Sequence, residues 1–276
     1  MSELAIALLL PRAARRTSAR VTRDLFDRRL RALRRDRAAQ LGPEMFLYDR
    51  AFGDCLERLQ DISRPFEKAL LIGCPASEWP GQLRKLVRSI DVVDPGLHFA
   101  QAANGTQIEE DRFDFGEDRY DLCLAIGTLD SVNDLPLALN LIGRALRPDA
   151  PFIGAISGGN SLATLRASLI EAARASGRVV ARAHPRIDPS SLGQLLTAAG
   201  FNMPVVDIDR VTLRYASLGN LVADLRAMGA TSTLTERAPH FTKSEAMMLQ
   251  QAFSNAGHNG RTEEVVEILH FLAWSK

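Results

Sequence analysis

The chain has 276 residues, of which 46% are hydrophobic and 24% are charged, and its formal net charge at pH 7 is +1. This composition is that of a folded globular protein and excludes an intrinsically disordered chain. No apolar run reaches the roughly eighteen residues of a membrane-spanning helix, so we expect no transmembrane segment. The cysteines Cys55, Cys74 and Cys123 lie far apart and form no CxxC pair, which favours a reducing compartment over a disulfide scaffold. We therefore expect a cytoplasmic protein, or a mitochondrial matrix protein if the source is eukaryotic.

The N-terminal segment is strongly basic. Residues 1–37 contain eleven arginines and four acidic residues, a local charge of +7. We expect residues 1–20 to form a disordered or targeting-like tail, because the apolar stretch 4–10 is too short for a secretory signal and lacks a cleavage pattern. Residues 21–64 are expected to form a basic helical extension, in which Phe26, Leu30 and Leu33 recur at helical spacing.

The arginines of this extension have three interpretations. The common one is a solvated helix face; the others are docking on an anionic partner, such as a membrane surface, and covering a cofactor pocket. Nucleic acid is not expected as a partner, because the basic charge does not extend over a whole domain and no aromatic residues interleave with it.

From residue 65 onward, short apolar runs alternate with helical patterns. We expect buried strands at 69–73, 90–94, 107–109, 120–126 and 151–156. Helices are expected at 82–88, 97–103, 135–146 and 161–175. Strands and helices that alternate at this spacing predict right-handed crossovers and a doubly wound parallel sheet of the α/β class.

The last third of the chain departs from this rhythm. Helices are expected at 190–199, 218–228 and 243–255, and two long strands at 205–215 and 263–274. The strand at 205–215 alternates apolar and polar residues, as a half-buried antiparallel strand does. If the two strands pair as a hairpin, residues 65–276 form one seven-stranded, mostly parallel sheet that ends with an antiparallel C-terminal strand.

Two residues mark a candidate ligand site. Ligands of open α/β sheets bind at the carboxyl ends of the strands. Here the first strand ends at Gly73 and the second ends at Asp94, about twenty residues later, which is the layout of an adenosine site. The carboxylate would accept hydrogen bonds from the ribose hydroxyls, and the glycine would let the backbone approach the ligand. Asp94 also precedes Pro95, a pair that is common in simple turns.

Several segments together resemble a known family. They are FDRRLRALRRDRAA (26–39), VNDLP (132–136), ISGGNSLATLR (156–166), AAGF (198–201), VDIDRVTLRY (206–215) and DLRAMG (224–229). With the predicted sheet, the chain resembles class I S-adenosylmethionine-dependent methyltransferases. It is most similar to the methyltransferase-fold assembly factors of respiratory complex I, described as hydroxylating an arginine of a complex I subunit. It resembles more distantly the malonyl-carrier-protein methyltransferase of biotin synthesis.

The resemblance implies a Rossmann-like methyltransferase fold, the cofactor S-adenosylmethionine, and a protein substrate or assembly partner. The residues expected on the cofactor side are Gly73, Cys74, Asp94, Glu109, Glu110 and Ile126. Those expected on the substrate side are Thr128, Asp130 and Tyr215. No catalytic residue is assigned, and no metal site is expected, because the histidines lack a ligand spacing.

The chain also departs from the superfamily pattern. Leu71 stands where an acidic residue is usual, and Pro75 and Ser77 stand where two further glycines are usual. A proline fixes φ and removes a backbone N–H group from the loop. Asp130-Ser131 replaces the His-Trp pair of the assembly-factor family. Two functions therefore stay open at this point: a methyltransferase or arginine-modifying enzyme that binds the cofactor at the ends of the first two strands, and a cofactor-lost scaffold that acts through protein contacts.

Overall fold

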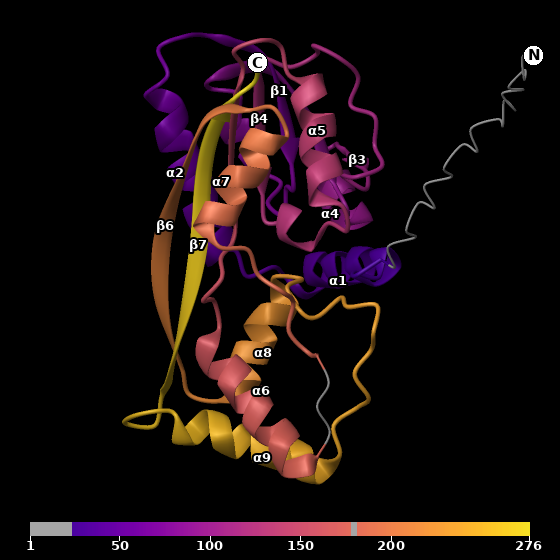
Figure 1. The fold of residues 1–276 in the computed structure, drawn as a ribbon. Helices are drawn as coiled ribbons and strands as arrows, with labels where there is room; N and C mark the ends of the chain where they lie inside the picture. Colours follow the sequence, from indigo (N-terminus) through magenta and orange to yellow (C-terminus); the bar gives the residue numbers. More distant parts are fainter. Residues whose placement is uncertain (1–23, 178–180) are drawn as a thin grey trace, which may run out of the picture.

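The structure is a computed structural model that describes residues 24–177 and 181–276, so the tail expected at 1–20 lies outside the described residues. The described chain forms a seven-stranded sheet with helices on both faces (Figure 1). Its strands are β1 (Phe66–Ile72), β2 (Val87–Asp94), β3 (Thr106–Gln107), β4 (Leu122–Ile126), β5 (Pro151–Ser157), β6 (Asn202–Tyr215) and β7 (Thr262–Trp274). Its helices are α1 (Arg28–Leu41), α2 (Phe46–Gln60), α3 (Trp79–Leu83), α4 (Leu97–Ala102), α5 (Leu135–Ala145), α6 (Ala163–Ser176), α7 (Pro189–Ala198), α8 (Leu218–Ala227) and α9 (Lys243–Asn255), with a short 3-10 turn at Leu129–Ser131.

The first five strands are parallel and lie in the order β3-β2-β1-β4-β5. Strands β4 and β5 and the second half of β1, residues 69–72, are almost entirely apolar because helices cover both of their faces. Residues of α5 and α7 pack on one face, and residues of α2 and α3 pack on the other. The expected fold class, a doubly wound and mostly parallel sheet, is confirmed.

Strands β7 and β6 complete the sheet in antiparallel orientation, β7 beside β5 and β6 beside β7. Both are longer than the parallel strands and run beyond the carboxyl ends of these strands (Figure 1). There they carry α6, α8 and α9, whose core contains Leu162, Tyr215, Leu221 and Phe253. We call these three helices the C-terminal lobe. It faces the strand ends where a ligand was expected.

Two elements differ from the prediction. Helix α2 lies within the helical extension expected at 21–64, but it was not predicted as a separate helix whose residues Phe52, Cys55 and Leu59 are buried against the sheet. The helix expected at 82–88 is wrong, since α3 ends at Leu83 and Val87 already pairs with β1. A proline near its start favours the earlier position of α3. The other predicted elements are present with their ends shifted by a few residues. None of the helices in the described ranges combines the length and apolarity that crossing a membrane requires.

Candidate functional site

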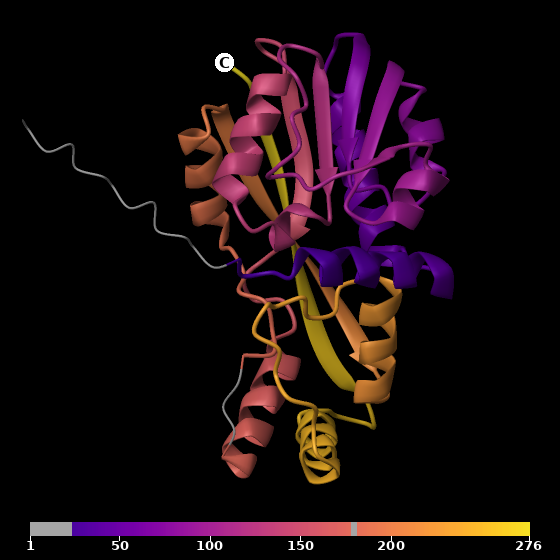
Figure 2. The same ribbon diagram turned by 90° about the vertical axis from the view of Figure 1, so that its right-hand side faces the viewer.

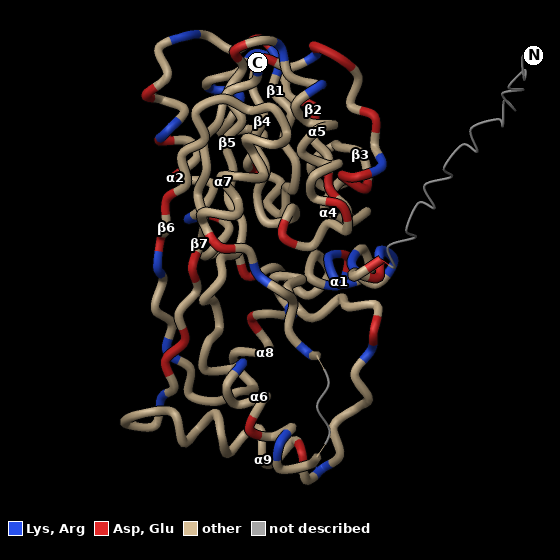
Figure 3. The backbone as a smooth tube through the Cα atoms, in the orientation of Figure 1, with Lys and Arg blue, Asp and Glu red and all other residues tan. Residues whose placement is uncertain are grey.

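Helix α1 crosses the carboxyl ends of the parallel strands, between the sheet and the C-terminal lobe (Figure 2). Its buried residues are Arg31, Arg35 and Ala38, whereas Leu33 is 42% exposed. Of the three interpretations of this helix, the solvated face is therefore wrong for these two arginines. The sheet presents carboxylates instead of apolar side chains at this place, and long cationic side chains are what such a surface accepts. Figure 3 shows the blue positions of α1 close to red positions of the sheet half of the molecule.

Asp94 lies at the end of β2 and is fully buried. Arg35 binds its carboxylate in a bidentate pair, with Nε 2.7 Å from Oδ1 and Nη2 2.6 Å from Oδ2. The backbone N–H of Gly96 donates to Oδ1 at 2.7 Å, and that of Cys74 donates to Oδ2 at 2.9 Å. We call the space formed by Gly73, Cys74, Asp94 and Gly96 the strand-end crevice. In this structure the guanidinium of Arg35 fills it.

Two further arginines of α1 bind neighbouring carboxylates. Arg31 pairs with the buried Glu110 at 2.7 and 2.8 Å and also donates to the carbonyl oxygen of Thr128. Arg28 pairs with Asp111 at 2.5 and 2.8 Å. Burial raises the pKa of Asp111, but the hydrogen bond from Arg28 outweighs burial, so this pKa lies below its usual value. The helix is thus fastened by three arginine–carboxylate pairs along one of its faces.

The turn after β1 is tightly packed. Gly73 has a φ of +79°, and a Cβ at this position would lie 2.3 Å from the carbonyl oxygen of Ile126. Only glycine avoids this clash. Burial, reinforced by the charge of Asp94, raises the pKa of the Cys74 thiol to about 12, which keeps this thiol protonated and unreactive.

The strand-end crevice does not fit an adenosyl group while Arg35 occupies it. A carboxylate offers about four lone-pair positions to donors. In Asp94, two are used by Arg35 and two by the backbone N–H groups of Gly96 and Cys74. The ribose hydroxyls would therefore find no free acceptor on Asp94. An adenosyl cofactor could bind here only after Arg35 had released this carboxylate.

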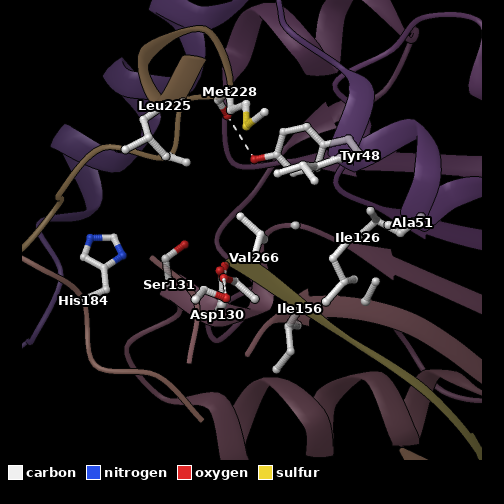
Figure 4. A pocket seen from close by; sticks show the side chains of 18 of the residues that line it. Tyr48, Ala51, Ile126, Asp130, Ser131, Ile156, His184, Leu225, Met228 and Val266 are labelled. Atoms are coloured by element: carbon white, nitrogen blue, oxygen red, sulfur yellow. Dashed lines mark hydrogen bonds between the residues drawn. The ribbon is translucent and has the colours of Figure 1, made fainter. Parts of the chain in front are cut away.

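A second cavity, which we call the central pocket, opens beside the crevice toward the C-terminal lobe and has a volume of about 130 Å³ (Figure 4). Its walls come from α1, α2, the ends of β4 and β5, β7 and α8. Ala51, Ile126, Ile156, Leu225 and Val266 give it a mostly apolar lining. Arg35 belongs to both sites, because it lines the pocket and reaches past its wall to Asp94, whereas Arg31 lines the pocket and pairs with Glu110.

The polar groups of the central pocket lie around Asp130. In the described part of the chain Asp130 has a single ion pair, with Arg186 Nη1 at the long distance of 3.9 Å. Arg186 also donates to the hydroxyl of Ser157. Burial lowers the pKa of Arg186, and Asp130 offsets this only in part. The pocket therefore contains a carboxylate and a guanidinium that are only loosely compensated.

Tyr48 and His184 have fixed hydrogen bonds on the pocket wall. Tyr48 donates to the carbonyl oxygen of Met228 at 3.0 Å, which joins α2 to the end of α8 (Figure 4). The ring of Tyr48 lies against Gly127, where a Cβ would be 2.3 Å from Cε1. His184 Nε2 accepts from the backbone N–H of Thr233 at 2.8 Å, and burial lowers the pKa of His184.

The residues predicted for the site fall into three groups. Gly73, Cys74, Asp94 and Glu110 lie in the crevice or beside it; Ile126 and Asp130 line the central pocket. Glu109, 36% exposed, contacts Arg28 and Arg112 at the rim, and Thr128 packs its methyl group toward Gly73. Tyr215 lies in the core of the C-terminal lobe, away from both cavities. Arg28, Arg31 and Arg35 were not predicted as site residues, although their spacing places them on one helix face.

Comparisons with known proteins agree with this architecture. A family model described as a methyltransferase domain matches residues 26–204. The mitochondrial arginine-hydroxylase NDUFAF5 of Rattus norvegicus is 31% identical, over 91% of this chain and 77% of its own length. A malonyl-[acyl-carrier protein] O-methyltransferase of Halorhodospira halophila is 27% identical, over 58% of this chain and 54% of its own. A Bacillus halodurans protein described as a candidate methyltransferase superposes with a TM-score of 0.57 at 11% identity, over 81% of this chain and 99% of that chain.

These similarities confirm the resemblance and the S-adenosylmethionine-dependent methyltransferase fold that underlies the cofactor prediction. The match to the family model spans more than half of the chain and includes α1, the ends of β1 and β2, and the part of the central pocket wall that comes from α1, α2, β4 and β5. The chain belongs to the methyltransferase-domain family and, within it, to the family of the NDUFAF5 arginine hydroxylases.

Proposed function

We propose that this chain is an assembly factor for respiratory complex I that binds an arginine-bearing segment of a protein partner in the central pocket. The assembly function is inferred from the NDUFAF5 arginine-hydroxylase relatives and from the resemblance of the sequence to complex I assembly factors. The observation that carries the proposal is the state of Asp130. Its carboxylate lies on the wall of a mostly apolar pocket and, among residues 24–177 and 181–276, has only the long ion pair to Arg186, so it has capacity to accept a second guanidinium.

The apolar lining supports the same ligand. A protein segment that inserts an arginine buries the aliphatic part of this side chain along with the charged end. Ile126, Ile156 and Val266 provide the apolar surface for it. A carboxylate at the end of an apolar pocket then sets the specificity, because an uncharged side chain would leave the carboxylate without a partner.

A second candidate function is methyl transfer from S-adenosylmethionine. The positions of Gly73 and Asp94 at the ends of β1 and β2 favour it, because they repeat the layout of an adenosine site. This function requires the carboxylate of Asp94 to be free for the ligand. The first candidate does not.

Complementation in a host that lacks this gene separates the two. Complex I assembly is measured as NADH-dependent quinone reduction in isolated membranes. We expect Asp130→Asn to lower it several-fold, because the amide keeps the shape but loses the charge, and Asp61→Asn, an exposed aspartate at the far end of α2, to behave as wild type. The double variant Arg35→Gln/Asp94→Asn keeps a neutral hydrogen-bonded pair and is expected to assemble complex I as well as Arg35→Gln alone, which is the control for the part of Arg35 that lines the central pocket.

The opposite pattern contradicts the proposal. If Asp130→Asn assembles complex I as well as wild type, the arginine-binding role of the central pocket is wrong. If the double variant assembles less complex I than Arg35→Gln alone while both remain folded and expressed at the same level, the function requires the Asp94 carboxylate, which favours the second candidate.

A further inference from the structure

We propose that the strand-end crevice is a guanidinium-binding site, that Arg35 of the same chain is its occupant, and that Arg35 competes with an adenosyl group for Asp94. This inference concerns the buried Arg35–Asp94 pair and does not depend on which partner the central pocket binds.

The hydrogen-bond geometry is that of a built guanidinium site. Arg35 approaches the carboxylate side-on, so that Nε and Nη2 each face one oxygen at 2.7 and 2.6 Å. Such fork-to-fork pairs are the geometry by which proteins recognise arginine. The backbone N–H groups of Cys74 and Gly96 hold the same carboxylate from the other side and fix its orientation.

The surroundings are shaped to the arginine as well. Arg35 is 5% exposed and Asp94 is 0% exposed, so the pair is closed off from water. The guanidinium carbon lies 5.1 Å from the centre of the Phe99 ring, a cation–π contact. A Cβ on Gly96 would lie 2.7 Å from Cβ of Arg35, so the close approach of α1 depends on a glycine at this position.

The charge of the occupant is permanent. Burial disfavours the cation, but the charge of Asp94 and the hydrogen bonds outweigh this cost, and the pKa of Arg35 lies above its usual value. An adenosyl group that took the carboxylate would therefore leave a buried cation without its partner. Arg35 and Asp94 also belong to the same chain, and an intramolecular ligand acts at an effective concentration of about a millimolar or more. A free adenosyl group must compete against this concentration.

The other two arginine–carboxylate pairs of α1 hold the whole helix in the position from which Arg35 competes for Asp94. Arg31 and Arg28 hold the same face of α1 on Glu110 and Asp111, and so keep Arg35 above Asp94. Removal of Arg35 alone therefore opens the crevice while the helix remains docked. This provides a selective variant for the test.

The test uses Arg35→Ala in the full chain, with methylguanidinium and S-adenosylhomocysteine as probes. We expect methylguanidinium to raise the Tm of Arg35→Ala and to leave the wild-type Tm unchanged. Calorimetry should show S-adenosylhomocysteine binding to Arg35→Ala at least about tenfold more tightly than to wild type, the smallest effect expected for hydrogen bonds to a charged group. The two probes should exclude each other. Arg214→Ala, which removes an exposed arginine from Glu263, is the matched control and should behave as wild type.

Arg35→Gln serves as a second variant if the alanine variant does not fold, because the amide still donates to Asp94 without the charge. In wild type, saturating S-adenosylhomocysteine should increase amide hydrogen exchange in residues 28–41, as the displaced arginine loosens α1. The proposal is overturned if wild type and the folded variant bind S-adenosylhomocysteine equally, or if neither binds it. It is also overturned if methylguanidinium fails to stabilise the variant, or if S-adenosylhomocysteine binds wild type without any change in the amide exchange of α1.

Discussion

The strand-end crevice and the central pocket are neighbours that share Arg35, yet their carboxylates are paired differently. In the crevice, Asp94 is matched by a bidentate arginine at 2.6 to 2.7 Å. In the pocket, Asp130 and Arg186 are 3.9 Å apart among apolar side chains. Charges bound this closely within the chain stabilise the fold, whereas loosely paired charges remain available to a ligand. This contrast is the basis on which we propose that the pocket recognises a partner, while the crevice pair holds α1 in place.

The largest effect should come from breaking the crevice pair on one side. Asp94→Ala leaves Arg35 as a buried cation without a partner and removes the acceptor of two backbone N–H groups. We expect the free energy of unfolding to fall by about 3–5 kcal/mol. Urea unfolding followed by circular dichroism measures this change. Glu263→Ala, at an exposed pair, should change little, and an equally small loss for Asp94→Ala would contradict the structural role of the crevice.

A double-mutant cycle measures how strongly Arg35 and Asp94 depend on each other for stability. Arg35→Gln and Asp94→Asn are each expected to destabilise the fold, but the double variant should lose less than the sum of the two, with a coupling of about 1–3 kcal/mol. The reason is that the double variant buries no unpaired charge. Additive losses in urea unfolding would show that the two side chains do not act as a pair.

A smaller effect is expected from the pocket wall. Tyr48→Phe removes the hydroxyl that donates to the carbonyl oxygen of Met228 and should lower the free energy of unfolding by about 1 kcal/mol. Because this bond joins α2 to α8, amide exchange at the end of α8 should increase as well. Unchanged exchange in α8 would mean that the hydrogen bond does not hold the pocket together.

The smallest effect is a pH dependence from His184. Burial lowers its pKa in the folded state below the usual 6.5, so the unfolded chain binds the proton more readily. Stability from this group is complete above about pH 6.5 and is lost as the pH falls toward the folded pKa. Burial lowers the pKa of His270 as well and gives the same sign. The measurement therefore compares wild type with His184→Gln in urea at pH 5 and 7.5. Equal pH slopes for the two proteins would exclude a contribution from His184.

Much of the fold could be predicted because its signals are local. The apolar runs that became β1, β4 and β5, and the alternating stretch that became β6, carry their own periodicity. The apolar face of α2, inside the helical extension expected at 21–64, was not predicted, because its buried residues Phe52, Cys55 and Leu59 are interspersed with charged and polar ones and only packing on the sheet shows that they form a face. The place of Asp94 at a strand end followed from the spacing of the first two strands.

What Asp94 binds was decided by the tertiary structure. The sequence determined a methyltransferase-type sheet, a carboxylate at the end of β2 and an arginine-rich helix some sixty residues earlier, but it left that helix open between a solvated face and a cover. The fold lays α1 across the strand ends and brings Arg35 within 2.7 Å of Asp94. The periodicity of hydrophobic residues in a sequence predicts which apolar side chains are buried. A buried arginine face instead depends on carboxylates that only the folded chain brings opposite it.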